Sequence, residues 1–224
     1  MSPRVPLWLL VPTGGRVPLS VKLGYTLFVL LWVPVYWHAN GPSNFLWICD
    51  FANFATLWAI WRESALVASS QLCGVLFIQA IWAVDFFGRL LLGSNPIGGT
   101  EYMFDFQTPL WVRAFSLFHL WSVPLLVWLV RRVGYDLHGW RLQSALALVL
   151  FPLGQQVGTK EQNLNWMWSP FGIEQTLLPP LLFAFVAVPI AALLLFKGGD
   201  LVVRGWLVSH PPPRTGSPSS NPQS

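Results

Sequence analysis

The sequence predicts an all-α polytopic membrane protein: a bundle of about six transmembrane helices followed by a disordered C-terminal tail. Two observations lead to this class. Of the 224 residues, 54% are hydrophobic and only 10% are charged, whereas a soluble domain carries about 25% charged residues. The apolar residues also fall in long runs separated by polar, Pro-rich or Gly-rich breaks, and a helix of roughly 20 apolar residues can cross a bilayer.

Six apolar runs have the length of a spanning helix. We place them at residues 21–38, 44–61, 65–92, 107–130, 140–157 and 175–196. The third run is long, so it forms either a steeply tilted helix or a helix that breaks near Gly74 or Gly88. Together the six runs predict one transmembrane domain, residues 21–197.

The two ends of the chain differ from this domain in composition. Residues 1–20 contain four prolines, and their apolar run "LWLLV" is too short to span a bilayer or to form a signal-peptide core, so no cleaved leader is expected. Residues 198–224 are predicted to be a tail, disordered from about residue 209, because "SHPPPRTGSPSSNPQS" is rich in Pro and Ser and has little to bury.

The distribution of Lys and Arg predicts the orientation, because short cytoplasmic loops hold the excess of positive charge. Ten of the thirteen lie on one side of the predicted spans: Arg4, Arg16, Lys22, Arg62, Arg131, Arg132, Arg141, Lys197, Arg204 and Arg214. The opposite loops hold only Lys160. We therefore expect a multi-pass protein of the cell (inner, cytoplasmic) membrane with both termini cytoplasmic. The net charge of +4 reflects this topology and does not indicate nucleic-acid binding.

Tryptophan is abundant, with fourteen residues, and many lie at predicted span ends. Amphipathic indole rings favour the headgroup region of a bilayer. We therefore expect most of the following to be interface anchors: Trp32, Trp37, Trp47, Trp61, Trp111, Trp128, Trp140, Trp166 and Trp168.

Polar residues of several predicted spans meet at one depth in the outer half of the bundle. Consecutive helix residues are separated by roughly 100° around the axis, so Cys49, Asp50 and Asn53 share one face of the second span. Arg113, Ser116 and His119 share a face of the fourth. The same depth holds Asp85, Arg89, Gln155 and Gln156, with Asn163 and Asn165 in the loop beyond. The inner half is nearly bare of such groups, apart from Ser69, Ser70, Gln71 and Cys73.

Ionisable side chains in a bilayer usually face the bundle interior and have a partner. Asp85 and Arg89 are four residues apart with the acid first, the favourable order for an ion pair on one helix face. Asp50 and His119 are a second possible pair. Either these pairs only hold helices together, or the convergence of four helices forms a site with Asn53, Asp85, Arg89, Arg113, Asn163 and Asn165 as substrate-binding residues.

Cys49 is the candidate nucleophile of such a site. Its neighbour is an acid, and a facing His is the usual means of producing a thiolate at neutral pH. Cys73 lies nearer the inner end of the next span, so we expect a small buried side chain there and no disulfide with Cys49. No ligand spacing typical of zinc is present, so no metal and no cofactor is expected.

The order of motifs resembles that of the bacterial YwaF-type membrane proteins and the related eukaryotic transmembrane ether-phospholipid acyltransferases. The likeness runs from about residue 44 to 196 and rests on "WICDFANF", "DFQTPLWVRAFSLFHLW" and "GTKEQNLNWMWSP". The third motif is longer than the family's compact Gly-Thr-Asn-Tyr loop, and the Pro before the Cys helix is displaced to Pro42. The resemblance implies Cys49 as the acyl-accepting nucleophile, His119 as its base, and Asn163 or Asn165 at the rim.

Three functions follow as expectations. The first is acyl transfer between membrane lipids through Cys49 and His119, with Asp50 orienting the His and Arg89 or Arg113 holding a phosphate headgroup. The second is a non-catalytic small-solute transporter or receptor, although neither internal repeats nor a polar inner half suggests a through-pathway. The third is an accessory subunit of a larger complex, whose Trp-rich faces contact partner membrane subunits.

Overall fold

The computed structural model describes residues 16–209, and all regular secondary structure within this range is helical. Short 3₁₀ turns lie in the loops between the longer helices, at Pro42–Leu46, Glu101–Met103, Leu164–Trp166 and Pro170–Gly172. The α-helices are α1 (Leu19–Asn40), α2 (Ile48–Arg62), α3 (Ala65–Leu92), α4 (Leu110–Ser116), α5 (Phe118–Val133), α6 (Gly139–Val157), α7 (Pro180–Ala191) and α8 (Lys197–Ser209).

Four stretches are long and apolar enough to cross a membrane: Leu19–Asn40, Ala65–Leu92, Leu110–Val133 and Pro180–Ser209. The helical class predicted from the sequence is confirmed for the described residues. The other two expected spans are less clear, because α2 has only 15 residues and is about 22 Å long, short of a hydrocarbon core of about 30 Å. Helix α6 has 19 residues and a more mixed composition.

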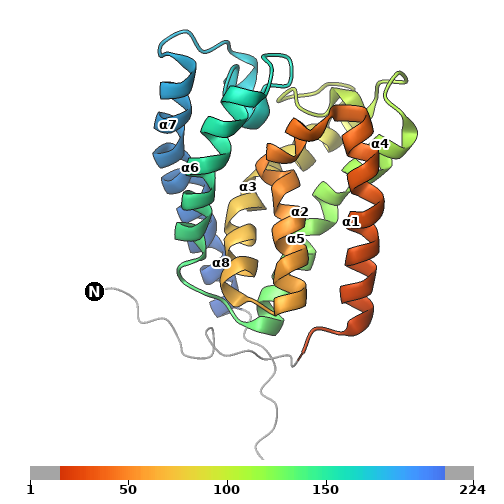
Figure 1. Cartoon of the computed structure of the whole chain (residues 1–224), viewed down its shortest axis with the longest axis vertical. Helices are drawn as coiled ribbons and strands as arrows, with labels where there is room; N and C mark the ends of the chain where they lie inside the picture. Colours follow the sequence, from red (N-terminus) through yellow and green to blue (C-terminus); the bar gives the residue numbers. More distant parts are fainter. Residues whose placement is uncertain (1–15, 210–224) are drawn as a thin grey trace, which may run out of the picture.

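Helix α3 lies at the centre of the bundle and contacts α2, α5, α6 and α8 (Figure 1). It is one unbroken helix of 28 residues, so the alternative with a break near Gly74 or Gly88 is wrong. Helix α1 packs on α2 and α4 along one edge, and α7 packs on α6 along the other. The centre is filled by apolar side chains such as Ala59, Ile60, Leu72 and Leu129, all fully buried.

The bundle has two distinct ends. Residues 41–47, 93–109 and 158–179 join helices at the upper end in Figure 1, which we call the loop end. The opposite end, which we call the basic end, holds the start of α1, the end of α8 and the turns around residues 63 and 134. The loop end is the side that the charge distribution predicts to be the outer one.

The fourth expected span, residues 107–130, is divided into α4 and α5 at Leu117. The N–H of Leu117 donates to the Ala114 carbonyl at 3.3 Å, and that of Leu120 donates to the Leu117 carbonyl at 3.0 Å. These bonds reach back three residues instead of four, which tightens the helix locally. The break takes the N–H of Leu120 away from the Ser116 carbonyl, which becomes available to another donor.

The sixth expected span ends too early at residue 196. Helix α7 continues through a π-helical turn, Ala192–Phe196, directly into α8, so the predicted domain boundary at residue 197 falls within a continuous helix. Asp200 and Val203 of α8 are buried in the bundle. Residues 1–15 of the expected N-terminal segment and the part of the tail from residue 210, where disorder was expected, lie outside the described residues.

The nine predicted tryptophan anchors differ in exposure, and five of them, Trp47, Trp128, Trp140, Trp166 and Trp168, are partly buried. Trp37, Trp61 and Trp111 are exposed, as expected for side chains at a bilayer interface. Trp32 is fully buried and lies against Tyr36, Phe45, Phe54 and Phe118. The expectation of an interface anchor is wrong for Trp32, which is part of an aromatic core.

Candidate functional site

Polar side chains from five helices and one loop gather near the loop end. We call them the loop-end cluster. Its members are Tyr36 of α1, Cys49 and Asp50 of α2, Trp82 of α3, Tyr102 of the α3–α4 loop, Ser116 of α4 and His119 of α5.

The centre of the loop-end cluster is a hydrogen bond between α1 and α4. The hydroxyl oxygens of Tyr36 and Ser116 lie 2.6 Å apart, and both side chains are buried. Ser116 donates its own hydroxyl proton to the Val112 carbonyl at 2.9 Å. Since a serine has one hydroxyl proton, Tyr36 is the donor in the bond with Ser116.

Tyr102 connects the loop to the helices beneath it. Its hydroxyl accepts a hydrogen bond from the indole N–H of Trp82 at 3.3 Å. Burial raises the pKa of Tyr102 to about 12; hydrogen bonds with Ser116 and Trp82 oppose the rise, whereas the Asp50 carboxyl group and the Cys49 thiol add to it. Asp50 and Cys49 are therefore close enough to act electrostatically on the phenol.

Cys49 and Asp50 lie in the first turn of α2, and both are buried. The Asp50 carboxylate accepts a hydrogen bond from the side-chain amide of Asn44, in the turn before the helix. Both cysteines of the chain are free, as expected from their separation.

Asn165 attaches the α6–α7 loop to the start of α2. Its side-chain oxygen accepts from the Ile48 N–H at 2.8 Å, and its amide donates to the Leu46 carbonyl at 2.9 Å. Asn163 instead makes its bonds within its own loop, to Trp168 and Ser169. Of the two predicted rim residues, only Asn165 reaches the segment that carries Cys49 and Asp50.

His119 is fixed in one orientation. Its Nδ1 lies 2.8 Å from the Ser116 carbonyl released by the α4–α5 break. Its ring stacks between Trp82 and Phe118, with centroid distances of 4.6 and 4.1 Å. Because a carbonyl only accepts, Nδ1 carries a proton, and in the neutral ring Nε2 is the basic nitrogen. The bonds of Asp50 and His119 are thus to Asn44 and Ser116, and not to each other as the sequence suggested.

Asp85 and Arg89 do not form the expected ion pair. The Asp85 carboxylate accepts the backbone N–H groups of residues 97–100 at 2.8 to 3.0 Å and two side-chain bonds from Asn95 and Thr100. Arg89 donates to the Gly93 carbonyl and lies over the Phe104 ring. A carboxylate satisfied this fully holds a loop in place, so Asp85 positions the segment that leads to Tyr102.

Arg113 points toward the same loop, donating to the Met103 carbonyl at 3.4 Å. Asn53 accepts a hydrogen bond from the Tyr25 hydroxyl at 3.1 Å. Both nevertheless have a buried nitrogen without a hydrogen-bond partner among the described residues, Nε of Arg113 and Nδ2 of Asn53. The same holds for Nε1 of Trp32 and for both polar atoms of Gln155, so several donors near the loop end are unsatisfied.

Sequence reasoning missed Tyr36, Trp82 and Tyr102, because aromatic residues in an apolar run look like packing or interface residues. It also missed a polar group at the basic end, so the expectation that the inner half is nearly bare is wrong. Asp200 is fully buried and accepts from the Tyr135 hydroxyl at 2.7 Å and from Lys197 at 2.6 Å. Its other contacts include Arg204, at 3.5 Å. Tyr135 also contacts the Cys73 sulfur at 3.2 Å.

No protein-family model, no curated protein and no solved structure matches the chain. The resemblance to YwaF-type proteins and ether-phospholipid acyltransferases therefore stays a hypothesis that rests on the quoted motifs.

Proposed function

We propose that the chain is a six-span membrane protein with both termini cytoplasmic, whose loop-end cluster binds the polar part of a lipid or a small solute. The ten to one distribution of Lys and Arg supports the orientation. The second span of this proposal comprises the 3₁₀ turn Pro42–Leu46, the extended residue Trp47 and α2. In this orientation the loop-end cluster faces the outer leaflet.

The observation that carries the binding function is the set of unsatisfied buried groups near the loop end. Each buried polar atom without a partner costs about 1–3 kcal/mol. Trp32 and Asn53 offer N–H donors, and the Gln155 amide offers both a donor and an acceptor. A ligand with hydroxyl, carbonyl or phosphate oxygens would satisfy these donors and offset that cost.

This binding function is tested by what the purified protein retains. The protein is isolated in mild detergent, extracted with organic solvent, and the extract is analysed by mass spectrometry. We expect a stoichiometric lipid or solute in the wild type that is lost when Tyr36→Phe and Ser116→Ala are combined. Ser144→Ala is the matched control, because Ser144 makes the same bond to a carbonyl four residues back but lies on α6, outside the cluster. Identical extracts from all three proteins would refute the proposal.

Acyl transfer is the second candidate, and the position of the proton on the His119 ring is suited to it. With the proton on Nδ1, the Nε2 atom is the base that would take the Cys49 thiol proton. The sulfur would attack the acyl carbonyl, a thioester would form, and the leaving alcohol would receive the proton from His119. Membranes incubated with a phospholipid carrying an alkyne-tagged acyl chain test this: hydroxylamine-sensitive labelling that Cys49→Ala abolishes supports transfer. Unchanged labelling in Cys49→Ala excludes this mechanism.

A further inference from the structure

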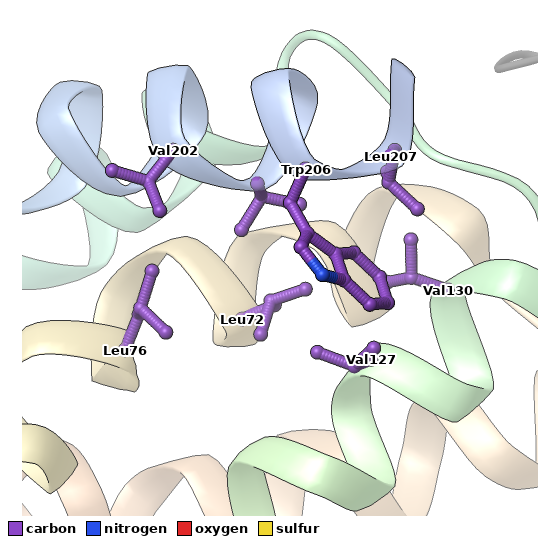
Figure 2. A pocket seen from close by; sticks show the side chains of 8 residues that line it. Leu72, Leu76, Val127, Val130, Val202, Trp206 and Leu207 are labelled. Atoms are coloured by element: carbon purple, nitrogen blue, oxygen red, sulfur yellow. The ribbon is translucent and has the colours of Figure 1, made fainter. Parts of the chain in front are cut away.

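An apolar cavity opens between α5 and α8 near the basic end, with α3 as its floor. Its volume is about 250 Å³, and its lining is entirely hydrophobic: Leu72, Leu76, Val127, Val130, Val202, Val203, Trp206 and Leu207. Figure 2 shows the Trp206 indole reaching from α8 toward Val127 and Val130 of α5. Leu72, on the floor, is fully buried.

The shape and chemistry of this cavity limit what can enter it. A cavity without polar partners does not hold ordered water, and an engineered apolar cavity of about 150 Å³ stays dry and binds benzene. A helix is about 10 Å across and would not fit. The lining spans about one helical turn, from Val202 to Trp206 and from Leu72 to Leu76, or roughly 6 Å along each axis. A flexible hydrocarbon chain matches these dimensions.

The rim of the cavity carries positive charge. Arg131 directly follows the lining residue Val130, and its guanidinium lies 4.4 Å from the centre of the Trp206 ring. In this arrangement the ring contacts the face of the positively charged guanidinium. Arg132 is adjacent, over Trp128 at 5.4 Å. Basic pockets between membrane helices are typical sites for anionic lipid headgroups.

We infer that the cavity holds one acyl chain of an anionic phospholipid from the leaflet at the basic end, with the lipid phosphate at Arg131. The apolar cavity contributes affinity for any lipid acyl chain of that leaflet, and Arg131 contributes the preference for a negatively charged headgroup. The inference depends on the bilayer location included in the proposed function, and not on the ligand of the loop-end cluster.

Native mass spectrometry of the detergent-solubilised protein tests the inference, with dioleoyl phosphatidylglycerol and dioleoyl phosphatidylcholine as the probes. We expect one phosphatidylglycerol bound about tenfold more tightly than phosphatidylcholine. Arg131→Gln should remove this preference, whereas Arg62→Gln, which changes an exposed arginine elsewhere at the basic end, should keep it. The combined Tyr36→Phe and Ser116→Ala variant should bind the lipid as the wild type does, which separates this site from the loop-end cluster.

A second pair of variants tests whether the cavity itself binds the acyl chain. Val202→Trp places an indole at the cavity mouth and should abolish binding of both lipids. Leu201→Trp is the matched control, since Leu201 is equally exposed on α8, at 58% against 52%, but does not line the cavity. The inference would be overturned if the wild type bound the two lipids equally or if Arg131→Gln kept the preference for phosphatidylglycerol. Undiminished lipid binding by Val202→Trp would overturn it too. A dimer that Val202→Trp disrupts without any change in lipid binding would overturn it as well.

Quenching of Trp206 fluorescence gives a readout that does not depend on the stability of these variants. The fluorescence of Trp206 is obtained as the difference between the wild-type signal and that of Trp206→Phe. This fluorescence should be quenched more strongly in vesicles with brominated phosphatidylglycerol than in vesicles with brominated phosphatidylcholine. Equal quenching by the two lipids would contradict a selective site.

Discussion

Asp200 at the basic end and Asp50 at the loop end are both buried, and they have different hydrogen-bond partners. At the basic end Asp200 lies beside two cations, Lys197 and Arg204, and accepts a hydrogen bond from the Tyr135 hydroxyl. At the loop end Asp50 accepts from the neutral amide of Asn44, and unsatisfied donors lie nearby. A buried carboxylate with cationic partners fixes the position of helices, whereas a buried carboxyl group with a neutral partner is better suited to receive a ligand. This comparison underlies our proposal that the basic end fixes the helices and that the loop end binds the ligand.

The largest expected effect comes from removing each aspartate in turn. Asp200→Asn removes the buried anion that Lys197, Arg204 and Tyr135 share and should cost about 3 kcal/mol, because a hydrogen bond to a charged group contributes about 1.5–3 kcal/mol. Asp50→Asn replaces a hydrogen bond to an amide and should cost about 1 kcal/mol. Unfolding by urea in mild detergent, followed by circular dichroism, measures both. Equal losses of stability would remove the distinction between the two ends.

A smaller effect is expected from the close approach of α8 to α3. A methyl group added at Gly199 would lie 2.8 Å from the Cys73 carbonyl oxygen, closer than packed atoms tolerate. Gly199→Ala should therefore destabilise the protein by about 1–3 kcal/mol. Gly205→Ala is the control on the same helix, since no atom lies within 4 Å of the added methyl group. If the two variants unfolded at the same urea concentration, the close packing of α8 on α3 would not contribute to stability.

The smallest effect concerns the attachment of α1 at the basic end. The Glu63 carboxylate accepts from Lys22 at 2.7 Å and from the Val17 N–H at 3.2 Å. The hydrogen bond from Lys22 lowers the pKa of Glu63 below its ordinary 4.5. The carboxylate therefore stabilises the fold above about pH 4.5, and this contribution is lost as the pH falls through the lowered pKa.

Glu63→Gln should accordingly reduce stability at pH 7 by less than about 1 kcal/mol, because the pair is partly exposed. The difference between wild type and variant should disappear well below pH 4. A difference that persisted unchanged in acid would show that the side chain acts through packing and not through its charge.

The sequence predicted much of this architecture, and its errors have physical causes. Apolar run length predicted α3 to the residue, and depth within the runs predicted that Cys49, Asp50 and Ser116 lie at one level. The depth of a residue in a span does not determine the hydrogen-bond donors of its carboxylate. The predicted ion pair of Asp85 with Arg89 is therefore wrong, and the N–H groups of residues 97–100 are the actual donors. The expected sixth span ended at residue 196, but Gly199 lets α8 approach α3 and bury Asp200.

The chain contains two cysteines, Cys49 in the loop-end cluster and Cys73 beside the basic-end aspartate, and their reactivities test the central claim most directly. Variants that keep one cysteine each, Cys73→Ala and Cys49→Ala, are reconstituted in vesicles and treated with a small charged methanethiosulfonate from the loop-end side. A binding site open to that side predicts that Cys49 reacts about tenfold or more faster than Cys73, equivalent to about 1.4 kcal/mol in access. If Cys49 reacts as slowly as Cys73, which is fully buried and in contact with Tyr135, the loop-end cluster is a closed helix contact and not a binding site.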